Sequence, residues 1–306
     1  MKNSLIKTYK AAKRKLPRPD DSLKIAIGHL ETSLQKQSRM RCLKEAEFKV
    51  FSQWGEDGII QYLTSEVEIE NDIFVEFGVQ DYSESNTRFL LINNNWSGLI
   101  IDADNAHKDF LHSQNLSWKY DIRAASAFIT KDNINQLIGD AGIQGSIGLL
   151  SVDIDGVDYW ILKEIDVVRP QIVIVEYNAF MGCEHAVSVP YKENFYRTTA
   201  HFSNFYWGAS LPAFHHLLTS RNYKFVGCNT AGNNAFFVSS ESASGAVEEV
   251  SLAEGFVDAK FWEYRQKDGS LDDTRDRTEY FKLIADLPIV DVVSDETKKI
   301  SDFDFD

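Results

Sequence analysis

The sequence has little cysteine and no long apolar run. Its 306 residues include three cysteines, which are too few and too scattered for a disulfide framework or a four-ligand zinc site. No stretch reaches the roughly 20 uninterrupted apolar residues that a membrane-spanning helix needs, and the first residues lack the apolar core of a secretion signal. Because 43% of the residues are apolar and 25% are charged, we expect a folded globular protein. The small number of scattered cysteines suggests the reducing cytoplasm as its location.

Basic charge is scarce outside the first 44 residues. Residues 1–44 carry twelve Lys or Arg against three Asp or Glu, whereas residues 45–306 carry twenty against forty-three. The acidic body argues against nucleic-acid binding, which needs a basic face. The basic N-terminal segment is suited to weak contact with an anionic surface, which predicts a position peripheral to the inner face of the membrane.

The first 44 residues are predicted to form a helical leader. Prolines at 17 and 19 break its basic first half, and Asp20, Asp21 and Ser22 then resemble a helix N-cap. Apolar residues recur at helical spacing after this point and predict a helix over 22–37. These residues are Leu23, Ile27, Leu30 and Leu34. Their stripe would pack on the body or on a second subunit, so a homo-oligomer is one expectation.

Residues 45–240 alternate between apolar runs and helix-length segments. Nearly continuous apolar strands separated by helices predict an α/β domain with a parallel sheet that is buried on both faces. The predicted strands are 73–78, 98–102, 116–120, 147–153 and 171–176, and the predicted helices are 84–94, 105–114, 131–140, 157–167 and 209–221. A Gly-containing turn between 223–228 and 234–238 predicts an antiparallel hairpin that closes the sheet.

Residues 241–306 form an acidic extension, with eighteen acidic and eight basic residues. Its aromatic and aliphatic side chains are too numerous for simple disorder. We expect helical pieces that dock on the body, followed by a frayed acidic end over 301–306.

Acidic groups stand at the ends of four predicted strands. Ligands of open parallel sheets bind at this edge. The four are Glu76, Asp102, Asp153 and Glu176. Capping of the following helix accounts for an aspartate, but it does not account for Glu76 within an apolar strand. The set therefore predicts a binding site.

Glycine is scarce where the first strand meets its helix, because only Gly78 stands there. One glycine instead of three argues against a pyrophosphate that lies on the helix N-terminus, and so against NAD or FAD. Asp102 follows 24 residues later, near the offset at which a carboxylate binds ribose hydroxyls. A ribose-bearing cofactor without phosphates fits this pattern. S-adenosylmethionine is such a cofactor, and its positive charges suit an acidic site.

Several segments resemble the FkbM-like family of class I S-adenosylmethionine-dependent methyltransferases. They include Phe74-Val-Glu-Phe-Gly-Val-Gln-Asp-Tyr-Ser-Glu-Ser-Asn-Thr87 and Leu150-Ser-Val-Asp-Ile-Asp-Gly-Val-Asp-Tyr159. The others are 51–58, 96–102, 170–178, 206–211 and 234–238, so the resemblance covers about 51–240 in the family's order. It implies a Rossmann-like, doubly wound seven-stranded sheet whose last strand is antiparallel. Tyr82 is a departure, since the family often has glycine there.

The resemblance also implies residue roles. Glu76 and Gly78 would line the methionine part of the cofactor, and Asp102 would hold its ribose. Asp121 would lie near the adenine. Gln53 and Asp57 would belong to the start of a helix that closes over the cofactor.

The segment Asp153-Ile-Asp155-Gly admits three interpretations. Haloacid dehalogenase-type phosphatases and metal-dependent glycosyltransferases both use an Asp-x-Asp motif. Macrocin-type sugar O-methyltransferases also resemble this stretch, with acids after the fourth and fifth strands that hold Mg²⁺. In that interpretation Asp153, Glu176 and Asn178 are the metal ligands, since all three offer oxygen.

Methylation of a hydroxyl requires a base or a metal, because the hydroxyl is a poor nucleophile. Asp153 is one candidate catalytic residue, and His185, in the loop after the fifth strand, is the preferred histidine base. Family analogy makes a sugar hydroxyl of a surface glycan or specialised metabolite the expected acceptor.

Overall fold

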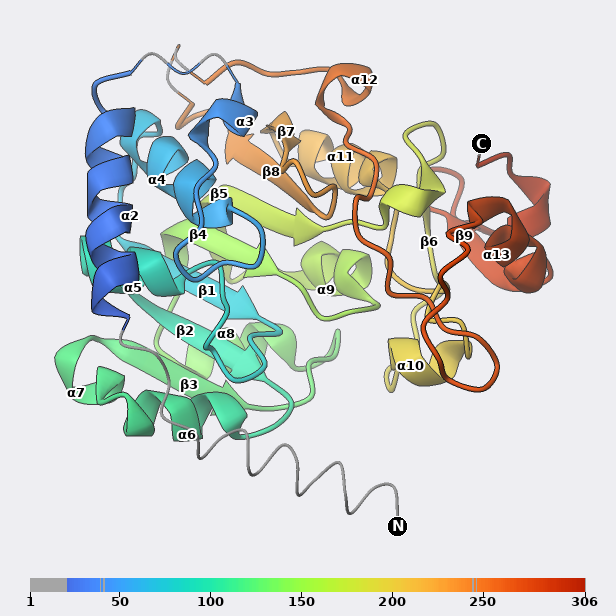
Figure 1. Ribbon diagram of the computed structural model, residues 1–306, viewed down its shortest axis with the longest axis horizontal. Helices are drawn as coiled ribbons and strands as arrows, with labels where there is room; N and C mark the ends of the chain where they lie inside the picture. The colour runs from blue at the N-terminus through green and yellow to red at the C-terminus, as the bar shows by residue number, and fades with distance from the viewer. Residues whose placement is uncertain (1–20, 39, 41, 244, 246, 306) are drawn as a thin grey trace.

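The computed structural model describes residues 21–38, 40, 42–243, 245 and 247–305. Its central sheet has seven strands. The strand order is β3-β2-β1-β4-β5-β8-β7 (Figure 1). The first five are parallel: β1 (Ile73–Phe77), β2 (Ser97–Asp102), β3 (Ile122–Ser126), β4 (Gly145–Val152) and β5 (Val168–Glu176). The last strand, β8 (Asn234–Ser239), runs antiparallel to β5 and pairs with β7 (Tyr223–Cys228) in a hairpin. The predicted α/β, Rossmann-like fold is confirmed.

Helices cover both faces of this sheet. On one face α4 (Glu56–Glu66), α5 (Arg88–Asn94), α6 (Ala106–Ser113) and α7 (Leu116–Lys119) pack in a core with Phe74, Ile100 and Ile174. On the other face α8 (Ile134–Asp140), α9 (Asp158–Glu164) and α11 (Leu211–Ser220) pack with Val75, Ile101 and Val173. Alternate residues of each strand thus enter opposite cores, as in a doubly wound fold.

The third strand differs from the prediction. Residues 116–120 were expected to form it, but Leu116–Lys119 form helix α7 and the strand is Ile122–Ser126. Trp118 is 74% exposed, so the apolar run that suggested a buried strand does not lie in a sheet. The true strand lies at the edge and contains Arg123 and two alanines, which give a weak apolar pattern.

The predicted leader helix is confirmed as α2 (Ser22–Gln35). It packs on α4 and α5 through the face that contains Gly28 and Thr32, which are both buried. The apolar stripe of Leu23, Ile27, Leu30 and Leu34 faces away from the body instead. Short helix α3 (Leu43–Ala46) follows. The basic segment 1–20, with its predicted membrane contact, lies outside the described residues.

The acidic extension is partly helical, as expected, with α12 (Leu252–Gly255) and α13 (Arg277–Ile284). It also contains an unpredicted hairpin of β9 (Pro288–Asp291) and β10 (Glu296–Lys299), which extends β6 (Val187–Ser188) into a second sheet. A frayed end over 301–306 is wrong as far as residue 305. Phe305 is buried, its ring stacks on Phe281, and its carbonyl oxygen accepts a hydrogen bond from Arg277.

Two short elements, η1 (Ala179–Met181) and α10 (Arg197–Ala200), lie in the long segment between β5 and α11, and η2 (Ile300–Asp302) follows β10. Among the described residues we find no helix with the length and apolar character needed to cross a bilayer.

Candidate active site

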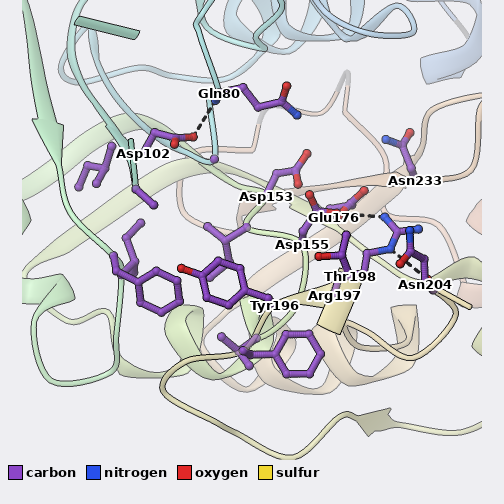
Figure 2. Close-up of a pocket in the computed structure, with 18 of the residues that line it drawn as sticks. Gln80, Asp102, Asp153, Asp155, Glu176, Tyr196, Arg197, Thr198, Asn204 and Asn233 are labelled. Carbon is purple, nitrogen blue, oxygen red and sulfur yellow. Dashed lines mark hydrogen bonds and ion pairs between the residues drawn. The ribbon is translucent and has the colours of Figure 1, made fainter. Parts of the chain in front are cut away.

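A cavity of about 390 Å³ lies at the carboxyl ends of the parallel strands. Residues that follow β1 to β5 form its floor, and segments 195–198 and 261–263 contribute to its walls. Figure 2 shows Asp102 and Gln80 at one end, Arg197 and Asn204 at the other, and Asp153 with Glu176 between them. The cavity therefore lies at the edge of the sheet where the sequence predicted a binding site.

Asp102 ends β2 with its carboxylate in the cavity. Its Oδ2 accepts a hydrogen bond from the backbone N–H of Gln80 at 2.7 Å, and its Oδ1 accepts one from the N–H of Asp104 at 3.1 Å. These bonds fix the orientation of the carboxylate. Because a carboxylate has about four acceptor positions, each oxygen keeps capacity for a further donor such as a ribose hydroxyl.

Gly78 lines the cavity where the turn after β1 meets the turn after β4. Its φ is +74°, and a Cβ at this position would lie 1.4 Å from the carbonyl oxygen of Asp153. Only glycine lets the turns after β1 and β4 approach so closely. Tyr82, which departs from the family pattern, is fully buried and does not line the cavity.

An apolar wall stands beside Asp102. It is formed by Ala103 after β2 and by Ala127, Phe128 and Ile129 after β3. Across the opening, the ring of Trp54 stacks on that of Phe261, with ring centroids 6.1 Å apart. Apolar side chains beside an oriented carboxylate provide a surface for a flat ligand that also carries hydrogen-bond donors.

Asp153 and Glu176 form a pair of carboxyl groups at the centre of the cavity. The preceding residues, Val152 and Val175, are paired across β4 and β5. Burial is the largest cause that raises the pKa of both carboxyl groups well above the usual range. The charge of Asp153 raises the pKa of Glu176 further, whereas a hydrogen bond from Glu176 lowers that of Asp153. The two carboxyl groups are therefore coupled, and the direction of both shifts favours a proton held between them.

Arg197 of α10 lies next to this pair. Its Nη1 is 3.0 Å from Asp155 Oδ1, its Nε donates to the carbonyl of Asn204, and its guanidinium stacks on Trp207. Its Nη2 and Glu176 Oε2 are both buried and have no hydrogen-bond partner among the described residues. This end of the cavity thus contains one positively charged side chain, Arg197, among several carboxylates.

Five predicted site residues line this cavity: Gln53, Gly78, Asp102, Asp153 and Glu176. Five others do not: Asp57, Glu76, Asp121, Asn178 and His185. Each of these five has another position or set of partners, which explains its absence from the cavity.

Glu76 is buried behind the cavity and holds a turn. Its carboxylate accepts hydrogen bonds from the Ser85 hydroxyl at 2.6 Å, the Asn86 N–H at 2.8 Å, and the N–H and hydroxyl of Thr87. Burial raises its pKa despite these bonds. Glu76 was expected to contact the methionine part of the cofactor, but its carboxylate organises the turn before α5 and does not line the cavity.

Asp57 has a similar structural part. Its Oδ2 accepts the backbone N–H groups of Val50, Phe51 and Ser52, each at 2.7 Å. Burial raises its pKa to about 6. Asp57 therefore shapes the loop that carries Gln53 into the cavity, and it does not line the cavity itself.

Asp121 lies at the opposite edge of the sheet. It is exposed and precedes β3, since the strand begins at Ile122 and not at 116. The residues near the predicted adenine position are Ala127 to Ile129, which follow the true strand. The prediction placed Asp121 after the third strand because it assigned that strand to 116–120.

His185 and Asn178 are also engaged elsewhere. The His185 ring packs edge-on against Phe303 and Phe305 of the C-terminal segment, with centroids 5.2 Å and 5.9 Å away. The Asn178 side chain donates to the Trp207 carbonyl at 3.0 Å and accepts from the Phe180 N–H at 3.2 Å. A catalytic His185 and a metal-binding Asn178 are therefore not supported by their positions.

The remaining oxygen donors do not fit a metal site. Within the described ranges, no three His, Cys, Asp or Glu side chains are grouped so that they could hold an ion. Asp158 is occupied by the N–H groups of Ile154 and Gly156, at 2.6 Å and 2.9 Å, and braces the Asp-x-Asp-Gly turn.

Several lining residues were not predicted from the sequence. They are Gln80, Phe128, Tyr196, Arg197, Thr198, Asn204, Asn233, Phe261 and Glu263. Most belong to irregular segments after β5 and β8, where no period marks a side chain as facing inward. Arg197 could have been singled out from the sequence, because it is a basic residue in the long segment after β5 of an acidic body.

No family model and no curated protein sequence matches the chain. Among solved structures, the O-methyltransferase TomG from Streptomyces achromogenes, involved in tomaymycin synthesis and solved with S-adenosylmethionine, is 13% identical. The alignment covers 76% of this chain and 96% of that one, with a TM-score of 0.40. An O-methyltransferase from Bacillus cereus, solved with S-adenosylhomocysteine, is 12% identical over 74% and 94%, with a TM-score of 0.36.

A third similar structure is a S-adenosylmethionine-dependent methyltransferase from Clostridium acetobutylicum. It is 10% identical, over 60% of this chain and 90% of that one, with a TM-score of 0.36. At such values the similarity carries no argument, so the function has to follow from the cavity itself.

Proposed function

We propose that the protein is an S-adenosylmethionine-dependent O-methyltransferase of the FkbM-like type. The observation that carries this proposal is one cavity with an oriented Asp102 carboxylate, an apolar wall, and a carboxyl pair in which Asp153 is half-buried and Glu176 is buried. The segments that resemble the family lie on β1, β2, β4, β5 and the closing hairpin of a sheet of the implied order. Both lines of support are independent of the solved structures above.

The cofactor would occupy the end of the cavity near Asp102. That carboxylate would accept the ribose hydroxyls, residues Ala127 to Ile129 would contact the adenine, and Gln53 and Gln80 would border the methionine part. When bound, S-adenosylmethionine supplies an electrophilic methyl group on a positively charged sulfur. The acidic side chains that line this end and the centre of the cavity favour a cationic ligand.

Asp153 is placed to act as the general base. In this proposal Glu176 holds the proton that the pair shares and donates it in a hydrogen bond to an ionised Asp153, whose carboxylate would then accept the proton of the acceptor hydroxyl. A raised pKa makes this carboxylate a stronger base than an ordinary aspartate. Arg197, held by Asp155 and Asn204, fixes the wall of the cavity beside the pair.

The proposed acceptor is a sugar hydroxyl. Polar side chains from Thr198, Asn204 and Asn233 line this end of the cavity, together with the rings of Tyr196 and Phe195. Hydroxyl-rich rings are bound by such a combination of amides, hydroxyls and aromatic faces. The alternatives, a metal-dependent glycosyltransferase or phosphatase, both require an ion for which the described donors make no site.

Substitution of Asp102 tests the cofactor assignment. Asp102→Ala should weaken S-adenosylhomocysteine binding by about 1.5–3 kcal/mol, or roughly 10- to 150-fold, as expected for hydrogen bonds to a charged group. Calorimetry on the two proteins measures this difference. Asp109→Ala, an exposed residue of α6, serves as the control and should bind as the wild type does. Equal affinity of Asp102→Ala and the wild type would contradict the assignment.

A further inference from the structure

Helix α2 carries an apolar stripe on its outer face. Leu23, Ile27, Leu30 and Leu34 are 71%, 48%, 66% and 57% exposed. The helix stands at the left margin of the molecule in Figure 1, and none of its residues lines the cavity. Single exposed apolar residues are ordinary on a protein surface, but four aligned on one helix mark an interaction site.

The opposite face of α2 is fixed to the body. Gly28 is buried, and a Cβ there would lie 2.5 Å from the ring of Phe89. Thr32 is also buried, and the Gln35 amide donates to the carbonyls of Ala46 and Gly58 at 2.6 Å and 3.0 Å. A rotation that buried the stripe would break these contacts. The stripe is therefore presented outward by a helix that is already packed.

The spacing of the stripe is that of a coiled-coil seam. Its four residues are separated by four, three and four positions, so Leu23 and Leu30 take heptad position d while Ile27 and Leu34 take position a. The body-facing residues Gly28 and Thr32 fall outside the seam. One face of α2 thus packs on the body of this chain, and the seam on its other face is available to a second helix.

The residues that flank the seam suit an antiparallel copy of the same helix. Lys24 and Glu31 occupy the e positions on one side, and small Ala26 and Ser33 occupy the g positions on the other. In an antiparallel pair the e positions of two helices face each other, so Lys24 would meet Glu31 of the partner subunit twice. In a parallel pair each charged residue would face only alanine or serine.

We propose that the stripe is the interface of a homodimer in which two α2 helices pair antiparallel about a two-fold axis. Such an interface is isologous and closes on itself, so it yields a dimer and not a fibre. The proposal concerns a surface away from the cavity and does not depend on the reaction.

Sedimentation velocity of the full chain between about 1 and 100 µM tests the proposal, and this range spans typical weak to moderate dimers. We expect a dimer. Leu30→Lys places a charge in the seam of both copies and should raise the dissociation constant about 100-fold or more. Leu283→Lys, at an exposed apolar residue of α13, is the matched control and should leave the dimer intact. Circular dichroism checks that each variant is folded.

Charge exchange separates a second copy from other occupants. Lys24→Glu and Glu31→Lys should each weaken the dimer about tenfold, since each creates two like-charge contacts, and the double exchange should restore it. Three results would overturn the proposal: a wild-type monomer at the highest concentration, no restoration by the double exchange, or a dimer that forms only after residues 1–20 are removed. The last result would mean that residues 1–20 of the same chain cover the stripe.

Discussion

Asp153→Asn should lower kcat/KM by about 10³-fold while it leaves S-adenosylhomocysteine binding nearly unchanged, because general-base catalysis contributes about 10²- to 10⁴-fold. The asparagine keeps the shape of the side chain but cannot take up the proton of the acceptor. Single-turnover rates and calorimetry on the same preparation separate the two quantities. Asp132→Asn, at an exposed surface position, is the isosteric control and should be fully active.

Glu176 should act through Asp153, and the pH dependence of kcat/KM in Glu176 variants should reveal this role. Because the hydrogen bond from Glu176 lowers the pKa of Asp153, Glu176→Ala should raise that pKa and move the acidic limb of kcat/KM to higher pH. Glu176→Gln keeps a donor and should move the limb less. A uniform loss of rate with an unmoved limb would instead indicate a purely structural part for Glu176.

Chelation distinguishes this base from a metal. The rate should be unchanged by EDTA, because the proposed base is Asp153 itself and, among the described residues, no three His, Cys, Asp or Glu side chains are grouped to hold an ion. Inhibition by EDTA that added Mg²⁺ reverses would contradict the shared-proton description and restore the metal-assisted alternative.

Glu76→Ala should produce the largest loss of stability, about 3–5 kcal/mol in the free energy of unfolding, because it leaves several buried donors without an acceptor. The affected groups are the N–H of Asn86 and the N–H and hydroxyl of Thr87, together with the Ser85 hydroxyl. Urea unfolding followed by circular dichroism measures the loss. Ser85→Ala, which removes one of these donors and keeps the carboxylate, should cost about 1 kcal/mol.

The pKa of Glu76 gives a further check on this result. Burial raises its folded pKa above the unfolded value, so the folded state retains the proton to higher pH. The wild type should therefore lose stability from this group as pH rises from about 4.5, the unfolded value, through the folded pKa. Glu76→Gln should remove that part of the pH dependence. A loss for Glu76→Ala no larger than for Ser85→Ala would show that the carboxylate does not organise the turn.

The central strands could be predicted because burial on both faces leaves a continuous apolar signature. Ile172 to Val175 of β5 are fully buried or nearly so, and Glu176 stands out at the end of that run. The edge strand β3 lacks this signature, since Arg123 and small residues replace the apolar run. The error at β3 then moved the predicted adenine contact from Ala127–Ile129 to Asp121.

Apart from Gln53, which came from the family resemblance, the site was predictable where a side chain's direction follows from a strand end. Asp102, Asp153 and Glu176 were placed in this way, and all three reach the cavity. Glu76 has the same sequence context, but nearby hydroxyl and N–H donors from 85–87 turn its carboxylate into a structural acceptor. Whether a carboxylate serves the cavity or a turn depends on such partners, which the sequence pattern does not reveal.

The loop residues could not be placed by periodicity. His185 was chosen for its chemistry, yet the hairpin β9–β10 and the segment that follows it bring Phe303 and Phe305 against its ring. The extension thus occupies the surface that was assigned to a catalytic histidine. Arg197 lines the cavity instead, and its side chain lies near Asp155 and Glu176 (Figure 2).

A crystal structure of the wild-type protein grown with S-adenosylhomocysteine tests the central claim most directly. The account predicts that the ribose hydroxyls hydrogen-bond to the Asp102 carboxylate, that the adenine lies against Ala127 to Ile129, and that the sulfur faces Asp153. A ligand bound elsewhere, or bound in this cavity with its ribose away from Asp102, would contradict it.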